Sequence, residues 1–83
     1  MRKVVDLKYR DRFIQLGLTI GMVRRLRGIS QEKLAEMVKI SRTHLATIEA
    51  PNVPYAFSME VLFDIADALE VEPGDLLNSK FPK

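Results

Sequence analysis

The stretch that decides the fold lies at residues 28–50 and reads GISQEKLAEMVKISRTHLATIEA. It predicts two short helices, 31–38 and 42–50, joined by little more than Lys39 and Ile40. So short a joint forces the two helix axes to cross steeply and to pack against each other at once. The apolar and small side chains that this packing needs are Leu34, Ala35, Val38, Ile40, Leu45 and Ile48. Their spacing is the pattern of a helix-turn-helix.

Three serines are placed to begin helices: Ser30, Ser41 and Ser58. A serine in this position accepts a hydrogen bond from a backbone N–H that the first turn of a helix leaves unpaired. An apolar residue precedes each serine and a leucine follows four residues after it, so the two can pack across the helix start. These pairs are Ile29 with Leu34, Ile40 with Leu45, and Phe57 with Leu62. Three matches in one register predict three helix starts.

The spacing of apolar residues predicts three further helices on either side of this stretch, over 8–27, 59–69 and 73–78. The first helix carries one stripe at helical spacing: Tyr9, Phe13, Leu16, Ile20 and Val23. Gly17 and Gly21 weaken this helix, so two shorter helices with a bend are an alternative. Gly28 is placed to end it in a left-handed conformation. The predicted fold class is therefore all-α, with five helices.

The chain has the size of a single domain, residues 1–83. We expect an N-terminal arm over 1–7, a helical core over 8–78 and a C-terminal tail over 79–83. The stretch 4–13 has three interpretations: a flexible basic arm, a dimer contact, or an extension of the first helix from about Lys8, which we favour.

Charge is distributed unevenly along the chain, although the net charge is only +2. Residues 1–27 carry eight basic and two acidic side chains, residues 28–50 three of each, and residues 51–83 two basic and six acidic ones. This polarity suits a protein that turns one face toward a polyanion. Solvation of helix surfaces explains it equally well, so charge alone does not decide.

Composition excludes several classes of function. The chain has no cysteine, hence neither a disulfide framework nor a thiolate metal site, and we expect no cofactor, no metal and no enzymatic activity. No apolar run reaches the roughly 20 residues of a membrane span, and the first residues lack a signal-peptide core. The expected location is the cytoplasm, with the nucleoid as the location of the DNA-bound form.

The chain resembles the family of the lambdoid phage repressors and Cro proteins, also called the xenobiotic-response-element family. The residues that carry the resemblance are Arg24, GISQEKLAE at 28–36, ISRT at 40–43, Ile48-Glu49, SMEVL at 58–62, IADALEV at 65–71 and Leu76-Leu77. Coverage is roughly residues 18–78. The resemblance implies a five-helix lambda-repressor-like fold, here with an N-terminally extended first helix. It also implies a transcriptional regulator, a repressor or autoregulator, that binds double-stranded DNA with helix 42–50 in the major groove.

The resemblance also assigns roles to individual residues. Arginine donates two hydrogen bonds to guanine, and threonine offers a hydroxyl to a base edge or a methyl to thymine. The implied base-contacting residues are Arg42, Thr43 and Thr47, with His44 near the groove or a phosphate. Helix N-termini and basic side chains suit phosphates. The implied phosphate contacts are Gln31, Ser30, Ser41, Arg25, Arg27 and Asn52.

Gln31 is also expected to brace the first recognition residue. Arg24 and Glu49 match a family pair that joins the first helix to the end of the third, and we expect a structural salt bridge between them.

Two departures from the family pattern stand out. Lys39 occupies the turn position where the family usually has glycine, and a left-handed lysine costs about 1 kcal/mol or more. We therefore allow for a slightly different turn geometry. The loop after the third helix is about two residues longer than usual and contains no lysine or arginine, which leaves Asn52 as its side-chain phosphate ligand.

Partners follow from these interpretations. We expect a homodimer through the C-terminal helix, with Leu76, Leu77 and Phe81 at the contact. An antitoxin that represses its own operon is one version of the regulator, and its partner would be a cognate toxin. The alternative function is a protein-interaction module of the same fold without a specific DNA site. Exposed Arg42 and Thr43 favour the regulator, whereas the loop without basic residues favours the module.

Overall fold

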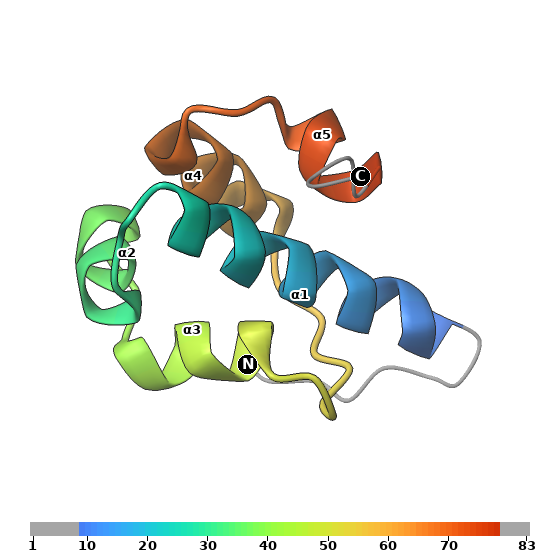
Figure 1. Ribbon diagram of the computed structural model, residues 1–83. Coiled ribbons are helices and arrows are strands. Elements are labelled where there is room, and N and C mark those ends of the chain that lie inside the picture. Colours follow the sequence, from blue (N-terminus) through green and yellow to red (C-terminus); the bar gives the residue numbers. More distant parts are fainter. Residues whose placement is uncertain (1–8, 79–83) are drawn as a thin grey trace.

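The computed structural model describes residues 9–78, which form five helices (Figure 1). Their bounds are α1 Arg10–Leu26, α2 Gln31–Val38, α3 Arg42–Glu49, α4 Met59–Leu69 and α5 Pro73–Asn78. The all-α, five-helix prediction is confirmed, and each helix end lies within two residues of the expected one. The predicted arm 1–7 and tail 79–83, together with Lys8 and Phe81, lie outside the described residues.

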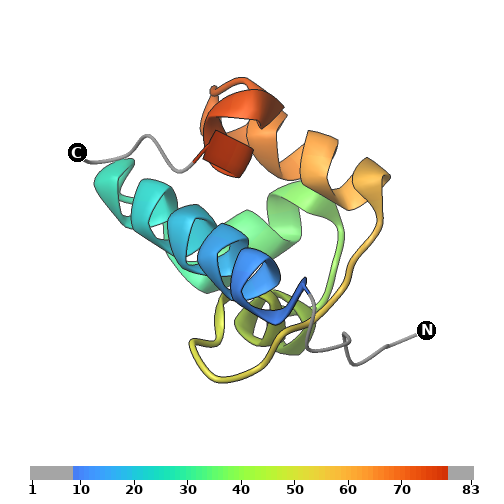
Figure 2. The same ribbon diagram turned by 90° about the vertical axis from the view of Figure 1, so that its right-hand side faces the viewer.

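Helix α1 crosses the middle of the molecule, and α3, α4 and α5 pack against it. Helix α3 lies on one side of α1, whereas α4 and α5 lie on the other (Figures 1 and 2). Helix α2 packs against both α3 and α4 and so connects the two sides at one end. None of the helices between residues 9 and 78 is long and apolar enough to cross a membrane.

The three predicted serine caps are confirmed. The side-chain oxygen of Ser30 accepts a hydrogen bond from the N–H of Lys33 at 3.0 Å. Ser41 accepts one from His44 at 2.9 Å and Ser58 one from Val61 at 3.1 Å. The apolar residues before the caps, Ile29, Ile40 and Phe57, pack against the core, as the staple pattern predicts.

Left-handed residues end three of the helices. Gly28 has the expected positive φ, 72°, just after α1. Lys39 also adopts the left-handed conformation, with φ 62° and ψ 41°, so the turn keeps the geometry that glycine would give it. The N–H of Ile40 then donates to the Ala35 carbonyl at 3.0 Å and closes the turn. Glu70 also adopts the left-handed conformation, with φ 62°, at the end of α4, which was not predicted from the sequence.

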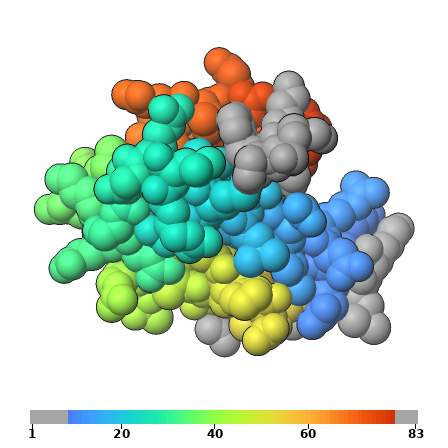
Figure 3. Space-filling view, in the orientation of Figure 1, coloured from blue at the N-terminus to red at the C-terminus, as the bar shows by residue number. Residues whose placement is uncertain are grey.

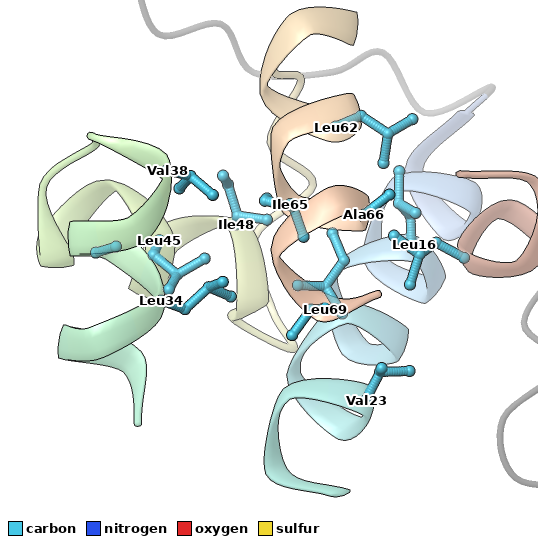
Figure 4. Packing of buried hydrophobic residues seen from close by; sticks show 13 residues of the cluster. Leu16, Val23, Leu34, Val38, Leu45, Ile48, Leu62, Ile65, Ala66 and Leu69 are labelled. Atoms are coloured by element: carbon cyan, nitrogen blue, oxygen red, sulfur yellow. The ribbon is translucent and has the colours of Figure 1, made fainter. Parts of the chain in front are cut away.

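One apolar core lies between α1 and the remaining helices (Figure 4). Its buried members are Leu16, Ile20, Val23, Leu34, Ala35, Val38, Leu45, Ile48, Leu62, Ile65, Ala66, Leu69 and Leu76. Leu76 has no exposed surface, so the prediction that it contacts a second subunit was wrong. Leu76 anchors the short helix α5 to the apolar core of the same chain. Its neighbour Leu77 is 56% exposed.

Helix α1 runs through Gly17 and Gly21 without interruption, so the alternative of two shorter helices was wrong. Both glycines are buried where α1 meets α3. A Cβ on Gly17 would collide with the backbone carbonyl of Ile48, and one on Gly21 would lie 3.0 Å from the Glu49 carboxylate. The two missing side chains therefore let α3 approach the backbone of α1, which fixes where α3 lies.

Candidate nucleic-acid interface

Helix α3 presents two different faces. Leu45 and Ile48 are almost completely buried, whereas Arg42 and Thr43 at its start are exposed. The outer face borders a shallow hollow of about 400 Å³. Its lining residues are Arg42, Thr43, Ala46, Thr47, Ala50 and Val53. Figure 3 shows α3 and the loop after it together along one edge of the molecule.

A buried ion pair fixes the end of α3. The Nε of Arg24 donates to Glu49 Oε2 at 2.8 Å, and its Nη2 donates to Oε1 at 3.0 Å. The third donor, Nη1, reaches the Ile29 carbonyl at 2.8 Å. The Arg24 and Glu49 side chains are only 8% and 5% exposed. Because the pair joins α1 to α3, it has the geometry of the structural salt bridge that we predicted.

Gln31 belongs to the same network. Its amide Nε2 donates to Glu49 Oε1 at 2.9 Å, which links the start of α2 to the end of α3. Among residues 9–78 this bond joins Gln31 to the last residue of α3, and no such bond joins it to the first. Gln31 is half-buried, and its predicted phosphate contact stays a prediction.

His44 packs against the loop that follows α3. Its ring packs edge-on against Tyr55, with ring centroids 5.5 Å apart. Its Nε2 is buried and has no hydrogen-bond partner among residues 9–78. The reason is helical spacing, because His44 lies one turn before the buried Ile48. The structure therefore turns this ring toward Tyr55, and His44 does not line the hollow beside α3.

The two arginines at the end of α1 point in different directions. A Cβ on Gly21 would contact both the Glu49 carboxylate and the Nη1 of Arg25, which places Arg25 on the α3 side of α1. Arg27 instead donates from Nη2 to the Glu70 carbonyl at 3.2 Å, at the end of α4. Residues two positions apart on a helix lie about 200° apart around it. The guanidinium of Arg27 thus lies on the side of α1 that faces away from α3.

Arg27 lines an acidic surface. The hollow that contains it is also lined by Ala66, Asp67, Glu70, Val71, Glu72 and Asp75. This surface lies on the α4 side of α1, opposite α3 (Figure 1). The acidic residues of the C-terminal third thus form a surface that lies away from α3.

The remaining predicted phosphate contacts are exposed. Ser30 and Ser41 lie at the starts of α2 and α3, and each keeps its hydroxyl hydrogen for a further acceptor while its oxygen caps the helix. Asn52 lies in the exposed turn after α3. Lys33 of α2, which is not one of the predicted contacts, is exposed and forms a surface ion pair with Glu36 at 3.6 Å.

Three residues of the outer face were not predicted from the sequence as site residues. Ala46, Ala50 and Val53 line the same hollow as Arg42, Thr43 and Thr47. Ala46 shares a helix face with Arg42, so its helical position was the available signal. No local pattern places Val53, which lies in an irregular loop.

The chain belongs to the family of Cro/C1-type HTH DNA-binding domains, because the family model matches residues 19–81. Among solved structures, the clp gene regulator ClgR from Corynebacterium glutamicum is 26% identical with a TM-score of 0.73, over 82% of this chain and 69% of that chain. The restriction-modification controller protein C.AhdI from Aeromonas hydrophila is also 26% identical with a TM-score of 0.73, over 80% and 97%. The hypothetical transcription factor NHTF from Neisseria is 25% identical with a TM-score of 0.70, over 90% and 80%. No curated protein matches the chain.

Proposed function

We propose that the protein is a sequence-specific regulator of transcription that inserts α3 into the major groove of double-stranded DNA. The observation that carries the proposal is the outer face of α3, where Arg42 and Thr43 are exposed while Glu49 is fixed by Arg24 and Gln31. A rigid helix with exposed groups at its start suits readout of base edges. Two of the similar structures, ClgR and C.AhdI, are themselves named as a gene regulator and a controller protein.

Phosphate contacts would surround this helix. The exposed hydroxyls of Ser30 and Ser41 and the N–H groups at the two helix starts can donate hydrogen bonds to phosphate oxygens. Arg25 adds a positive charge on the α3 side of α1. The acidic surface around Asp67 and Glu70 lies on the opposite side of α1 and would repel the duplex. Together these charges orient the protein with α3 toward DNA.

The regulator is further proposed to act as a homodimer on an inverted repeat, as a repressor or autoregulator. Exposed Leu77, Met59 and Tyr9 surround an apolar hollow of about 270 Å³ between α1, α4 and α5. Burial of these side chains against a second copy would remove apolar surface from water. The contact would thus use Leu77 without Leu76.

Selection of bound duplexes from a random pool at near-physiological salt tests the function. We expect an enriched inverted repeat that is held at least ~10³-fold more tightly than random DNA. An enriched site without two-fold symmetry would contradict the dimer alone. Weak binding without any enriched motif would contradict the proposal and favour the protein-interaction module, with the acidic surface or α3 binding a partner protein such as a toxin.

Arg42→Ala is expected to weaken binding to the selected site by about 1–3 kcal/mol and to relax base preference at one position of each half-site. The reason is the loss of a two-donor contact to a base edge, whereas contacts to phosphates are retained. Repeated selection with the variant measures the change. An unchanged sequence preference would show that α3 is not the reading helix.

Arg25→Ala and Arg27→Ala form a matched pair two residues apart. Arg25→Ala is expected to weaken binding to all sequences alike and to reduce the slope of log affinity against log salt by about one for each bound subunit. Arg27→Ala is expected to leave the slope unchanged, because its guanidinium lies at the end of α4. Titrations across a salt series measure both slopes. Equal effects of the two variants would contradict the proposed orientation on DNA.

A further inference from the structure

The hollow beside α3 has a polar end and an apolar end. Arg42 and Thr43 at the start of the helix supply its hydrogen-bonding groups. Farther along, the side chains of Ala46, Ala50 and Val53 consist only of aliphatic carbon. Val53 is 38% exposed, although its side chain is large and apolar, because the loop after α3 brings it to the surface at this end.

The hydroxyl of Thr47 does not change this apolar character. Its Oγ1 donates its hydrogen to the Thr43 carbonyl at 2.9 Å, within the same helix. The hydrogen is therefore not available to an acceptor on a base edge, and Thr47 offers DNA its methyl group and the remaining lone pairs of its oxygen. The side chains at this end of the hollow thus present no free hydrogen-bond donor.

In the major groove, only one kind of group matches such a surface. Base edges present acceptors, donors and, on thymine, the C5-methyl group. A pocket of methyl groups without hydrogen-bond donors cannot bond to purine N7 or O6 atoms. Covering a methyl group that water would otherwise surround does lower the free energy, because apolar surface is buried. The same methyl is carried by 5-methylcytosine.

We propose that the apolar end of the hollow, formed by Ala46, Thr47, Ala50 and Val53, receives the 5-methyl group of a pyrimidine. This inference rests on the proposed function, since it concerns the same face of α3. It assigns a specificity-determining role to Val53, a loop residue, and it places the methylated pyrimidine at a different base pair from the one that Arg42 reads.

The test starts from the selected duplex and replaces each thymine in turn by deoxyuridine, which removes only the methyl group. We expect one thymine per half-site at which this change weakens binding by about three- to fivefold, the effect of uncovering one methyl. A parallel series replaces each cytosine by 5-methylcytosine. A loss with deoxyuridine assigns thymine, and a comparable gain with 5-methylcytosine assigns that base instead.

Protein variants tie the effect to the hollow. With Val53→Ala, the sensitivity to the methyl group is expected to shrink to less than about twofold, and Val53→Thr, which keeps the shape, should retain part of it. Met37→Ala, which removes an exposed apolar side chain from α2, should leave the full three- to fivefold effect. Thermal unfolding of each variant confirms that it is folded.

The outcomes separate the inference from the proposed function. If a site is selected and Arg42→Ala relaxes it, but no methyl change alters affinity, the inference is wrong and the proposed function stands. A methyl effect that Val53→Ala leaves intact also overturns it. If no site is selected at all, the proposed function fails and this inference fails with it.

Discussion

Replacing Glu49 with alanine is expected to lower the free energy of unfolding by about 3–5 kcal/mol, the usual cost of breaking a buried ion pair from one side. The carboxylate accepts two hydrogen bonds from Arg24 and one from Gln31. Without it, the guanidinium is left buried with the Ile29 carbonyl as its remaining partner. A domain of this size has a total stability of about 4–12 kcal/mol, so urea unfolding will show a large shift of the midpoint.

Two further variants isolate the cause of this effect. Glu49→Gln keeps an acceptor and the shape of the side chain, so its cost should be smaller than that of Glu49→Ala. The double variant Arg24→Met with Glu49→Leu removes both charges and should recover part of the loss, because an apolar pair needs no counter-charge. A loss of less than about 1 kcal/mol in Glu49→Ala would contradict the buried network.

Gly17→Ala is expected to lower the free energy of unfolding by about 2 kcal/mol or more. Helix propensity alone favours alanine by up to about 1 kcal/mol. The new Cβ, however, would occupy the position of the Ile48 carbonyl, a backbone group that cannot rotate away. Overpacking of this kind typically costs about 1–3 kcal/mol and more where nothing can move, so the collision outweighs the propensity.

Gly74→Ala is the matched control for this prediction. Gly74 lies in α5, has no positive φ, and a Cβ there would meet nothing within 4 Å. The same substitution should therefore be neutral or stabilising by up to about 1 kcal/mol. Thermal unfolding of the two variants under one condition decides the matter. If Gly17→Ala were as harmless as Gly74→Ala, α3 would not pack as closely on α1 as the structure shows.

The sequence was sufficient to predict the helices because their signals are local. Each serine cap needs only the backbone of its own first turn, and the Arg24 and Glu49 pairing came from a family pattern. Gly17 and Gly21 illustrate the limit. Within the sequence they look like weak points of α1, and their role depends on the backbone of α3, which is remote along the chain.

Three side chains meet neighbours that the sequence did not indicate. Leu76 was expected at a dimer contact but is buried in the core of its own chain. His44 packs against Tyr55, and Arg27 donates to the Glu70 carbonyl. Which neighbour a side chain meets depends on tertiary packing. Lys39 differs from the usual glycine in residue type and still adopts the left-handed conformation that the turn needs. Closing the turn outweighs the modest cost of a left-handed lysine.

The two faces of α3 also bear on how such a protein changes its target during evolution. The inner residues, Leu45, Ile48 and Glu49, hold the helix in place, whereas Arg42, Thr43 and Ala46 face outward. Substitutions at separate sites without shared partners tend to have additive effects on stability. Mutations on the outer face can thus accumulate one at a time while each intermediate stays folded. Under the proposed function, a new DNA recognition sequence is accessible by single substitutions, each exposed to selection on binding alone.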